Sequence, residues 1–290
     1  MIKQYQFGHT IVEVRLPEEM RTPDCMELFE VQAENKAAVE KVCELEFADD
    51  LAAPVAEFCR EYPNARQIVR KNINLLIAED RECRILRLEG APMPYAVYVE
   101  EDTMHNHTWV SRDVQNILQF ETIFVSLLGL EKIMIQKEAM ILHCAYMCRD
   151  GKAVLFSAPS ETGKSTQADL WGKYRGTRTI NGDKSLLIRE ENGWYANGWP
   201  ICGSSEICNN ESYPIQAIVM LHQAKENEVH RLGVAEAMKK LMAQITINMW
   251  NADFQIKAMD MIQQLIMEVP VYELGCNISE DAVKCLERVL

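Results

Sequence analysis

The segment AVLFSAPSETGKSTQADLW, residues 153–171, constrains the fold more than any other part of the chain. An apolar run of strand character at 153–157 leads into a polar loop at 158–166, and helical character continues from Gln167. The loop has the spacing [Ala/Gly]-x4-Gly-Lys-[Ser/Thr], and between a strand and a helix this pattern is typical of a phosphate-binding (Walker A) loop. We therefore expect an α/β domain with a strand–loop–helix unit here.

Each part of the loop has a chemical task in this interpretation. Successive backbone N–H groups and the positive end of the following helix can surround phosphate oxygens. Gly163 lets the main chain approach the ligand, Lys164 would reach the outer phosphates, and the Ser165 hydroxyl would ligate Mg²⁺. Ala158 stands where such loops usually have their first Gly and adds only a methyl group. The predicted nucleotide-binding residues are Ala158, Ser160, Glu161, Thr162, Gly163, Lys164, Ser165 and Thr166.

The composition narrows the classes of partner. The chain has 30 basic and 43 acidic residues and a formal net charge of -13, which argues against nucleic acid, since a backbone-binding surface needs clustered Lys and Arg. It lacks an apolar run of about eighteen residues and the layout of a secretory signal. The ten cysteines are scattered without a Cys-x-x-Cys pair, as is typical of reduced thiols. We expect a cytoplasmic protein that binds neither nucleic acid nor a membrane.

The chain is expected to divide into a β-rich N-terminal domain at 1–112 and a mixed α/β domain at 113–290. In the first domain, short apolar or alternating runs predict strands at 9–16, 25–31, 67–79, 83–90, 94–101 and 107–111. A helix is expected at 36–46 or at 51–61. Apolar residues near helical spacing predict a connecting helix over 114–137.

The second domain combines strands and helices. A β-hairpin is predicted around the turn Arg149-Asp150-Gly151. Further strands are expected within 177–190, 193–200, 216–223 and 269–274, and helices over 167–173, 234–250 and 252–267. A last helix is expected to begin after Ser279, its predicted N-cap.

Three motifs in order carry a family resemblance: LHCAYM at 142–147, AVLFSAPSETGKST at 153–166 and INGDKSLLI at 180–188. The segment 140–290 resembles the kinase domain of HPr kinase/phosphorylase and its serine-kinase-like relatives, which belong with phosphoenolpyruvate carboxykinase. The resemblance is faint before residue 110. It implies a P-loop kinase domain of this type, with ATP and Mg²⁺ as cofactors, preceded by a smaller β-rich domain.

By this resemblance, His143 lies close to the phosphates and Asp183 matches a magnesium-binding carboxylate, so Ser165 and Asp183 are predicted to share the metal. The kinase relatives usually carry two adjacent acids, the first of which is proposed as the base, whereas this chain has Gly182 there. Phosphoryl transfer depends mainly on positioning and charge neutralisation, so another group could take the proton. The predicted catalytic residues are His143, Asp183 and Glu206.

The resemblance implies an ATP-dependent phosphotransferase that moves the γ-phosphoryl group to a hydroxyl acceptor. The acceptor is either a small molecule such as serine or a Ser of a peptide or protein. HPr itself is not expected, because residues 199–206 replace the Gly- and Arg-rich stretch that recognises it. A nucleotide-binding sensor or scaffold without turnover is the alternative, motivated by Gly182, whereas carboxykinase chemistry lacks a visible substrate-carboxylate clamp. Whether the chain forms a homo-oligomer is left open.

Each candidate also has a purely structural interpretation. His143 lies in an apolar run, where a core histidine with a hydrogen-bond partner is common. Asp183, beside Asn-Gly, could be a turn residue, and Glu206 suits an exposed loop. Lys184 and Arg231 could pair with phosphate oxygens or could simply be solvated.

Overall fold

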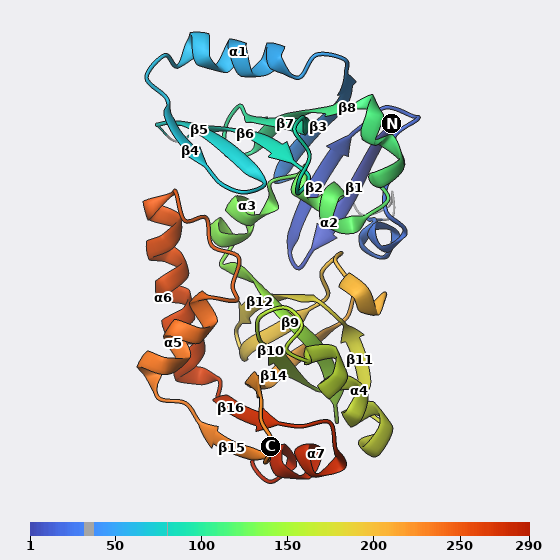
Figure 1. The fold of residues 1–290 in the computed structure, drawn as a ribbon, viewed down its shortest axis with the longest axis vertical. Helices are drawn as coiled ribbons and strands as arrows, with labels where there is room; N and C mark the ends of the chain where they lie inside the picture. Colours follow the sequence, from blue (N-terminus) through green and yellow to red (C-terminus); the bar gives the residue numbers. More distant parts are fainter. Residues whose placement is uncertain (32–37, 80) are drawn as a thin grey trace. The chain divides into compact units, whose positions relative to one another are not determined.

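The computed structural model describes residues 1–31, 38–79 and 81–290. They form two compact units, Met1–Ile133 and Met134–Leu290 (Figure 1). The division falls later than the expected boundary at 112/113, because residues up to 133 pack with the first unit. In particular, Lys132 Nζ donates a hydrogen bond to Glu100 Oε2 at 2.5 Å.

The first unit is built around one mixed sheet. Among the described residues its strand order is β1-β2-β3-β8-β7-β6-β5-β4. The strands are β1 (Ile2–Phe7), β2 (Thr10–Arg15), β3 (Lys41–Ala48), β4 (Arg66–Val69), β5 (Ile73–Ala78), β6 (Arg81–Arg87), β7 (Pro94–Glu100) and β8 (His105–Ser111). β3 pairs in parallel with β2 and β8, and the other pairs are antiparallel. The β-rich character expected of this region is therefore present.

The structure decides two sequence predictions within residues 24–61 of this unit. The predicted strand at 25–31 is wrong: most of it forms the 3-10 helix η1 (Asp24–Phe29), in which Met26 and Phe29 are buried at a spacing of three. The helix expected at 51–61 is confirmed as α1 (Ala52–Glu61), which buries Pro54 and Phe58. The other option, 36–46, lies partly outside the described residues and forms β3 from Lys41 onward.

The predicted continuous helix over 114–137 is also wrong. The segment forms three short pieces, η2 (Arg112–Ile117), α2 (Glu121–Ser126) and α3 (Leu130–Gln136). Gly129 interrupts it with a φ of +55°, and a Cβ there would lie 2.7 Å from the Tyr98 hydroxyl. Close packing against this ring therefore favours a bend at Gly129 over a continuous helix.

The second unit contains a mixed sheet in which one end strand also pairs with an internal strand. Its strands are β9 (Ala139–Arg149), β10 (Lys152–Ser157), β11 (Arg178–Asn181), β12 (Lys184–Glu190), β13 (Gly193–Asn197), β14 (Ser212–Gln223), β15 (Glu228–Arg231) and β16 (Val271–Cys276). The order is β10-β9-β12-β13-β14-β16-β15, with β11 on β9 and a further pairing of β10 with β14. This pairing closes a ring of strands that fixes the ends of β9, β10 and β12 near one another.

The hairpin predicted around Asp150-Gly151 is confirmed as β9 and β10, which pair in an antiparallel register. Asp150 and Gly151 both have positive φ, 49° and 74°, as a two-residue hairpin turn requires. β9 is long enough to pair with β10 through its second half and with β12 through its first half. It therefore carries His143 to the place where these strands meet.

Helices cover the sheet on two sides. They are α4 (Lys164–Arg175), the short η3 (Gly203–Ser205), α5 (Val234–Met242), α6 (Ala252–Glu268) and α7 (Glu280–Glu287). Buried residues of α5 and α6 join one hydrophobic cluster with the sheet, and those of α4 and α7 join another, on different sides of the strands in Figure 1. The expected mixed α/β class is confirmed for this unit. The helix predicted over 234–250 ends early, because Ile245 forms an extended bridge with Leu142.

Candidate functional site

The loop after β10 has the predicted strand–loop–helix arrangement. β10 ends at Ser157, and α4 begins at Lys164 with Gly163 as its N-cap. Gly163 has a φ of 109°, which glycine adopts without strain. Glu161 has a φ of 63°, in the left-handed region that non-glycine residues seldom adopt. The Gly163 carbonyl accepts the first helical bond, from Gln167 N at 3.0 Å. The N–H groups of the first turn of α4 have no acceptor within the helix, so they face the loop.

Lys164 lies inside this loop with only 7% of its surface exposed. Its Nζ donates hydrogen bonds to the carbonyl oxygens of Ala158 at 3.2 Å and Pro159 at 3.3 Å. An ammonium has three donors, so one more can serve a ligand. Burial lowers the pKa of Lys164, and the nearby Asp183 carboxylate counteracts this in part. The loop therefore holds a poorly solvated cation that an anion would stabilise.

Asp183 is fixed by the turn between β11 and β12. The Asn181 side-chain oxygen accepts hydrogen bonds from the backbone N–H groups of Asp183 and Lys184, both at 2.9 Å. The carboxylate accepts from Lys184 Nζ at 2.7 Å and lies 3.4 Å from His143 Nε2. Burial raises the pKa of Asp183, but His143 and Lys184 together outweigh it and bring that pKa well below its usual range. Asp183 is thus held ionised.

Loop, strand and turn meet at a polar cavity of about 350 Å³. It is lined by His143, Ser160, Glu161, Gly163, Lys164, Ser165, Thr166, Gly182, Asp183 and Ser204. The Ser165 hydroxyl donates to the Gly182 carbonyl at 3.5 Å, which places it beside the Asp183 turn. The structure therefore brings together most of the residues that the sequence predicts for one site.

Three predicted residues do not line this cavity. Ala158 is fully buried behind the loop and contributes its carbonyl to Lys164. Thr162 is half-buried in the loop. Glu206 is exposed, in a left-handed conformation just after η3, with a φ of 57°. Its catalytic role stays a prediction.

Residues that sequence reasoning missed support the site from outside the loop. Gln244 Oε1 lies 3.2 Å from His143 Nδ1, and the Gln244 carbonyl accepts a hydrogen bond from His143 N at 3.0 Å. Nothing in the local sequence marks Gln244, because its place depends on α5 ending at Met242. Ser204 lines the cavity from η3. It lies within residues 199–206, which the sequence identifies only as a replacement for the Gly- and Arg-rich stretch.

Gly182, the position at which the resemblance to HPr kinases predicts an acid, has no room for a side chain. A Cβ at this position would lie 1.7 Å from Ser205 Oγ and 2.5 Å from Ser205 Cβ. Ser205 is held in place because its hydroxyl donates to Cys202 O at 2.8 Å and accepts from Ile207 N at 3.2 Å. This chain therefore has no acidic side chain at position 182, and Ser205 occupies the space that such a side chain would need.

Replacing Gly182 with Ala is expected to lower the free energy of unfolding by about 1–3 kcal/mol, the usual cost of overpacking. Urea denaturation measures this loss. The second change Ser205→Gly in the same chain should restore much of it, because it removes both clashing atoms. Gly233→Ala is the matched control, since a Cβ there meets nothing within 4 Å. A double variant no more stable than Gly182→Ala would contradict the packing argument.

The site suits a metal that takes few protein ligands. Within the described ranges, no group of three or more His, Cys, Asp and Glu side chains could hold a metal ion. Ser165 and the ionised Asp183 both line the cavity, and they are hard oxygen donors. Mg²⁺ usually takes one or two carboxylates and completes its shell with phosphates and water. The residues present therefore fit magnesium together with a phosphate ligand.

The fold and the cavity define a mixed α/β protein with a polar site where a strand, a loop and a helix meet. The model of the SynChlorMet cassette protein ScmC family matches residues 110–290, more than half of the chain. The chain belongs to this ScmC family. A search of curated proteins finds no match.

Among solved structures, the chain is similar to the Hpr(Ser) kinase/phosphatase from Coxiella burnetii. The match has 11% sequence identity and a TM-score of 0.30, and it covers 51% of this chain and 95% of that one. At this TM-score the similarity is too distant to assign an activity. No helix in the described part of the chain has the length and hydropathy needed to cross a bilayer.

Proposed function

We propose that the chain is an ATP-dependent phosphotransferase that moves the γ-phosphoryl group of ATP to a hydroxyl acceptor. One observation carries this proposal: the poorly solvated Lys164 ammonium, the Ser165 hydroxyl and the ionised Asp183 carboxylate line one cavity at the start of α4. The Lys164 ammonium and the amides at the start of α4 suit the negative charge of a triphosphate. The Ser165 and Asp183 oxygens suit the Mg²⁺ ion that accompanies it. The acceptor is a small hydroxyl compound or a Ser of a peptide or protein.

The residues divide the work by their positions. The amides at 163–166 and Lys164 would hold the outer phosphates, while Ser165 and Asp183 would hold Mg²⁺, which neutralises charge that develops on the phosphoryl oxygens. Asp183 and His143, 3.4 Å apart, are the groups placed to take the proton of the acceptor hydroxyl. Gln244 orients the His143 ring through Nδ1. Because such reactions need positioning more than a strong base, this pair is sufficient without an acid at 182.

A transfer assay tests the proposal. The protein is incubated with Mg²⁺ and γ-labelled ATP, together with free serine and other hydroxyl amino acids, sugars or Ser-containing peptides. Labelled product and ADP are then measured. The proposal predicts equal amounts of ADP and phosphorylated product with one acceptor class. ADP and phosphate at a rate that no acceptor changes would contradict transfer.

A second candidate, a nucleotide-binding sensor or scaffold without turnover, is favoured by the closed space at Gly182. It predicts tight ATP binding with no product from any acceptor. The double variant Gly182→Asp with Ser205→Gly restores an acid and removes the side chain that fills its space. If only this variant transfers phosphate, the natural chain is a nucleotide binder that has lost catalysis.

ATP affinity is expected to fall as pH rises through the pKa of Lys164. Only the ammonium attracts phosphate, and burial places this pKa below the ordinary lysine value of 10.5, so the fall begins at lower pH than for an ordinary lysine. Titration of a fluorescent ATP analogue from about pH 8 to pH 10 measures this fall in affinity, because a terminal phosphate whose last pKa is about 6 stays almost fully ionised over that range. The affinity of Lys164→Met should not change over the same range. An equal fall of ATP affinity in the variant would show that another group causes the pH dependence.

A further inference from the structure

The first unit contains a larger groove that the proposed phosphoryl transfer does not use. It has a volume of about 720 Å³, within the roughly 300–1,000 Å³ of typical ligand pockets. Its wall is formed by the turn before α1, the start of α1, the end of β6, the turn into β7 and the start of η2. All of these belong to Met1–Ile133, so the groove is complete within one unit.

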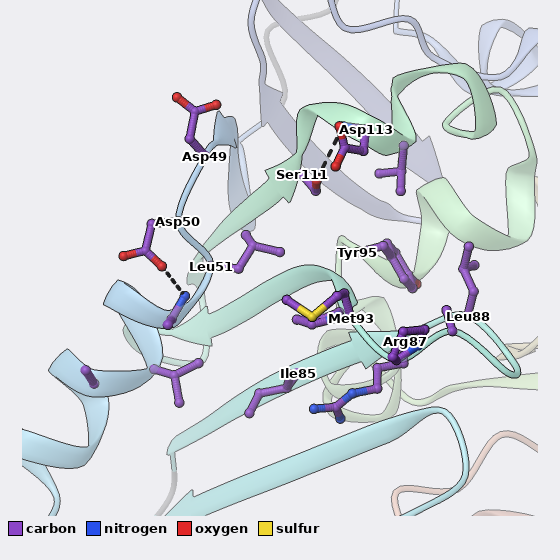
Figure 2. Close-up of a pocket in the computed structure, with 17 residues that line it drawn as sticks. Asp49, Asp50, Leu51, Ile85, Arg87, Leu88, Met93, Tyr95, Ser111 and Asp113 are labelled. Carbon is purple, nitrogen blue, oxygen red and sulfur yellow. Dashed lines mark hydrogen bonds between the residues drawn. The ribbon is translucent and has the colours of Figure 1, made fainter.

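The lining of this groove is mainly apolar. Leu51, Val55, Ile85, Met93 and Tyr95 contribute side chains to it, and Figure 2 shows Met93 in the middle of the group. Met93 is 73% exposed. An apolar ligand side chain placed over Met93 would remove this apolar surface from water, which favours binding.

Three carboxylates stand around this apolar surface. Asp49, Asp50 and Asp113 line the groove, and Arg87 is the cation among its lining residues. In Figure 2, Asp49 and Asp50 lie at one side, Asp113 lies at the upper edge and Arg87 lies across the groove from Asp50. The edge near α1 and η2 is therefore acidic, and an occupant with positive charge there would be complementary.

The carboxylates are only loosely engaged within the chain. Asp49 Oδ1 lies 3.8 Å from Arg112 Nε, and both side chains are largely exposed, by 93% and 57%, so the pair is weak. Asp50 Oδ1 accepts a hydrogen bond from Ala52 N at 2.8 Å, but a carboxylate can accept several bonds. A ligand cation can therefore engage both groups without breaking a strong internal contact.

We propose that this groove docks a short peptide segment in which an apolar side chain is flanked by Arg or Lys. The apolar side chain covers Met93 and Ile85, and the basic residues face Asp49, Asp50 and Asp113. Basic groups at the acidic edge give selectivity over acidic peptides, and the apolar contact supplies most of the affinity. This docking is independent of nucleotide, so it stands or falls separately from phosphoryl transfer.

Fluorescence anisotropy with a labelled, amidated hexapeptide, Gly-Arg-Leu-Leu-Arg-Gly, tests the proposal on the full chain without ATP. The peptides Gly-Glu-Leu-Leu-Glu-Gly and Gly-Arg-Ser-Ser-Arg-Gly carry the same label and serve as controls. Saturable binding of the first peptide alone is expected. Equal binding of the acidic peptide, or no binding of the basic apolar one, would overturn the proposal.

Variants locate the binding. Met93→Ser should weaken it about fivefold or more, whereas Met267→Ser, at a methionine that is 70% exposed in the other unit, should not. The triple change of Asp49, Asp50 and Asp113 to Asn keeps side-chain shape and should weaken binding about tenfold, while Asp260→Asn should not. Lys164→Met should bind the peptide as the natural chain does. Concentration-dependent dimers that Met93→Ser abolishes, with no peptide binding, would instead assign the groove to a second copy of the chain.

Discussion

Replacing Lys164 with Met is expected to weaken ATP binding by about 10- to 100-fold, the effect of one or two charge-assisted hydrogen bonds. Lys164 is buried in the loop and has a donor left for a ligand, so its ammonium is placed to contact the outer phosphates. Met keeps the apolar stem and removes only the charge. Titration calorimetry with ATP and Mg²⁺ measures the change.

The same variant separates binding from folding. Its thermal midpoint is expected to stay within about 3 °C of the natural chain, because burial already disfavours the charged form of Lys164. Lys173→Met, an exposed lysine near the other end of α4, is the matched control and should bind ATP normally. Undiminished ATP affinity in Lys164→Met would exclude this loop as the phosphate site.

Replacing Asp183 with Asn is expected to slow phosphoryl transfer at least about 100-fold, because charge stabilisation by a bound metal is worth several kcal/mol. Asn has the same size but cannot neutralise Mg²⁺. Without metal, ATP should bind the variant as tightly as the natural chain or more tightly, since a carboxylate that repels phosphate is gone. Steady-state transfer rates across a range of Mg²⁺ concentrations measure the first effect, and ATP affinities with Mg²⁺ and in EDTA measure the second.

Slower transfer with Mg²⁺, together with undiminished ATP affinity without metal, distinguishes a metal ligand from a residue with a purely structural role. Asp169→Asn, an exposed position on α4, controls for the loss of one negative charge and should change neither quantity. If Asp183→Asn weakened ATP binding equally with and without Mg²⁺, Asp183 would be acting through the shape of its turn. Metal ligation would then be contradicted.

The sequence predicted the loop and its neighbours because their signals are local. Hydrophobic alternation and a two-residue turn define the β9–β10 hairpin, and the Gly163-Lys164-Ser165 pattern marks the start of α4. His143 and Asp183 came from a family resemblance, and the pairing of β9 with β12 places them together. Where local pattern and fold agree, prediction from one sequence succeeds.

The failures have long-range causes. The continuous helix predicted over 114–137 is broken where Gly129 packs on Tyr98, a residue of a distant strand. Gln244 supports His143 from a loop whose position depends on the packing of α5. Ser205 closes the space at Gly182 through a fold-dependent contact. Such contacts leave no periodic trace in a sequence, so the architecture was predictable in outline and the support of the site was not.

A crystal structure of the full chain with Mg²⁺ and a non-hydrolysable ATP analogue tests the central claim most directly. We expect the triphosphate to follow the loop at 158–166, with phosphate oxygens hydrogen-bonded to Lys164 Nζ and to the first amides of α4. The metal ion should contact Ser165 Oγ and the Asp183 carboxylate. A fully formed loop without bound phosphate, with the nucleotide elsewhere or absent at saturating concentration, would contradict the account.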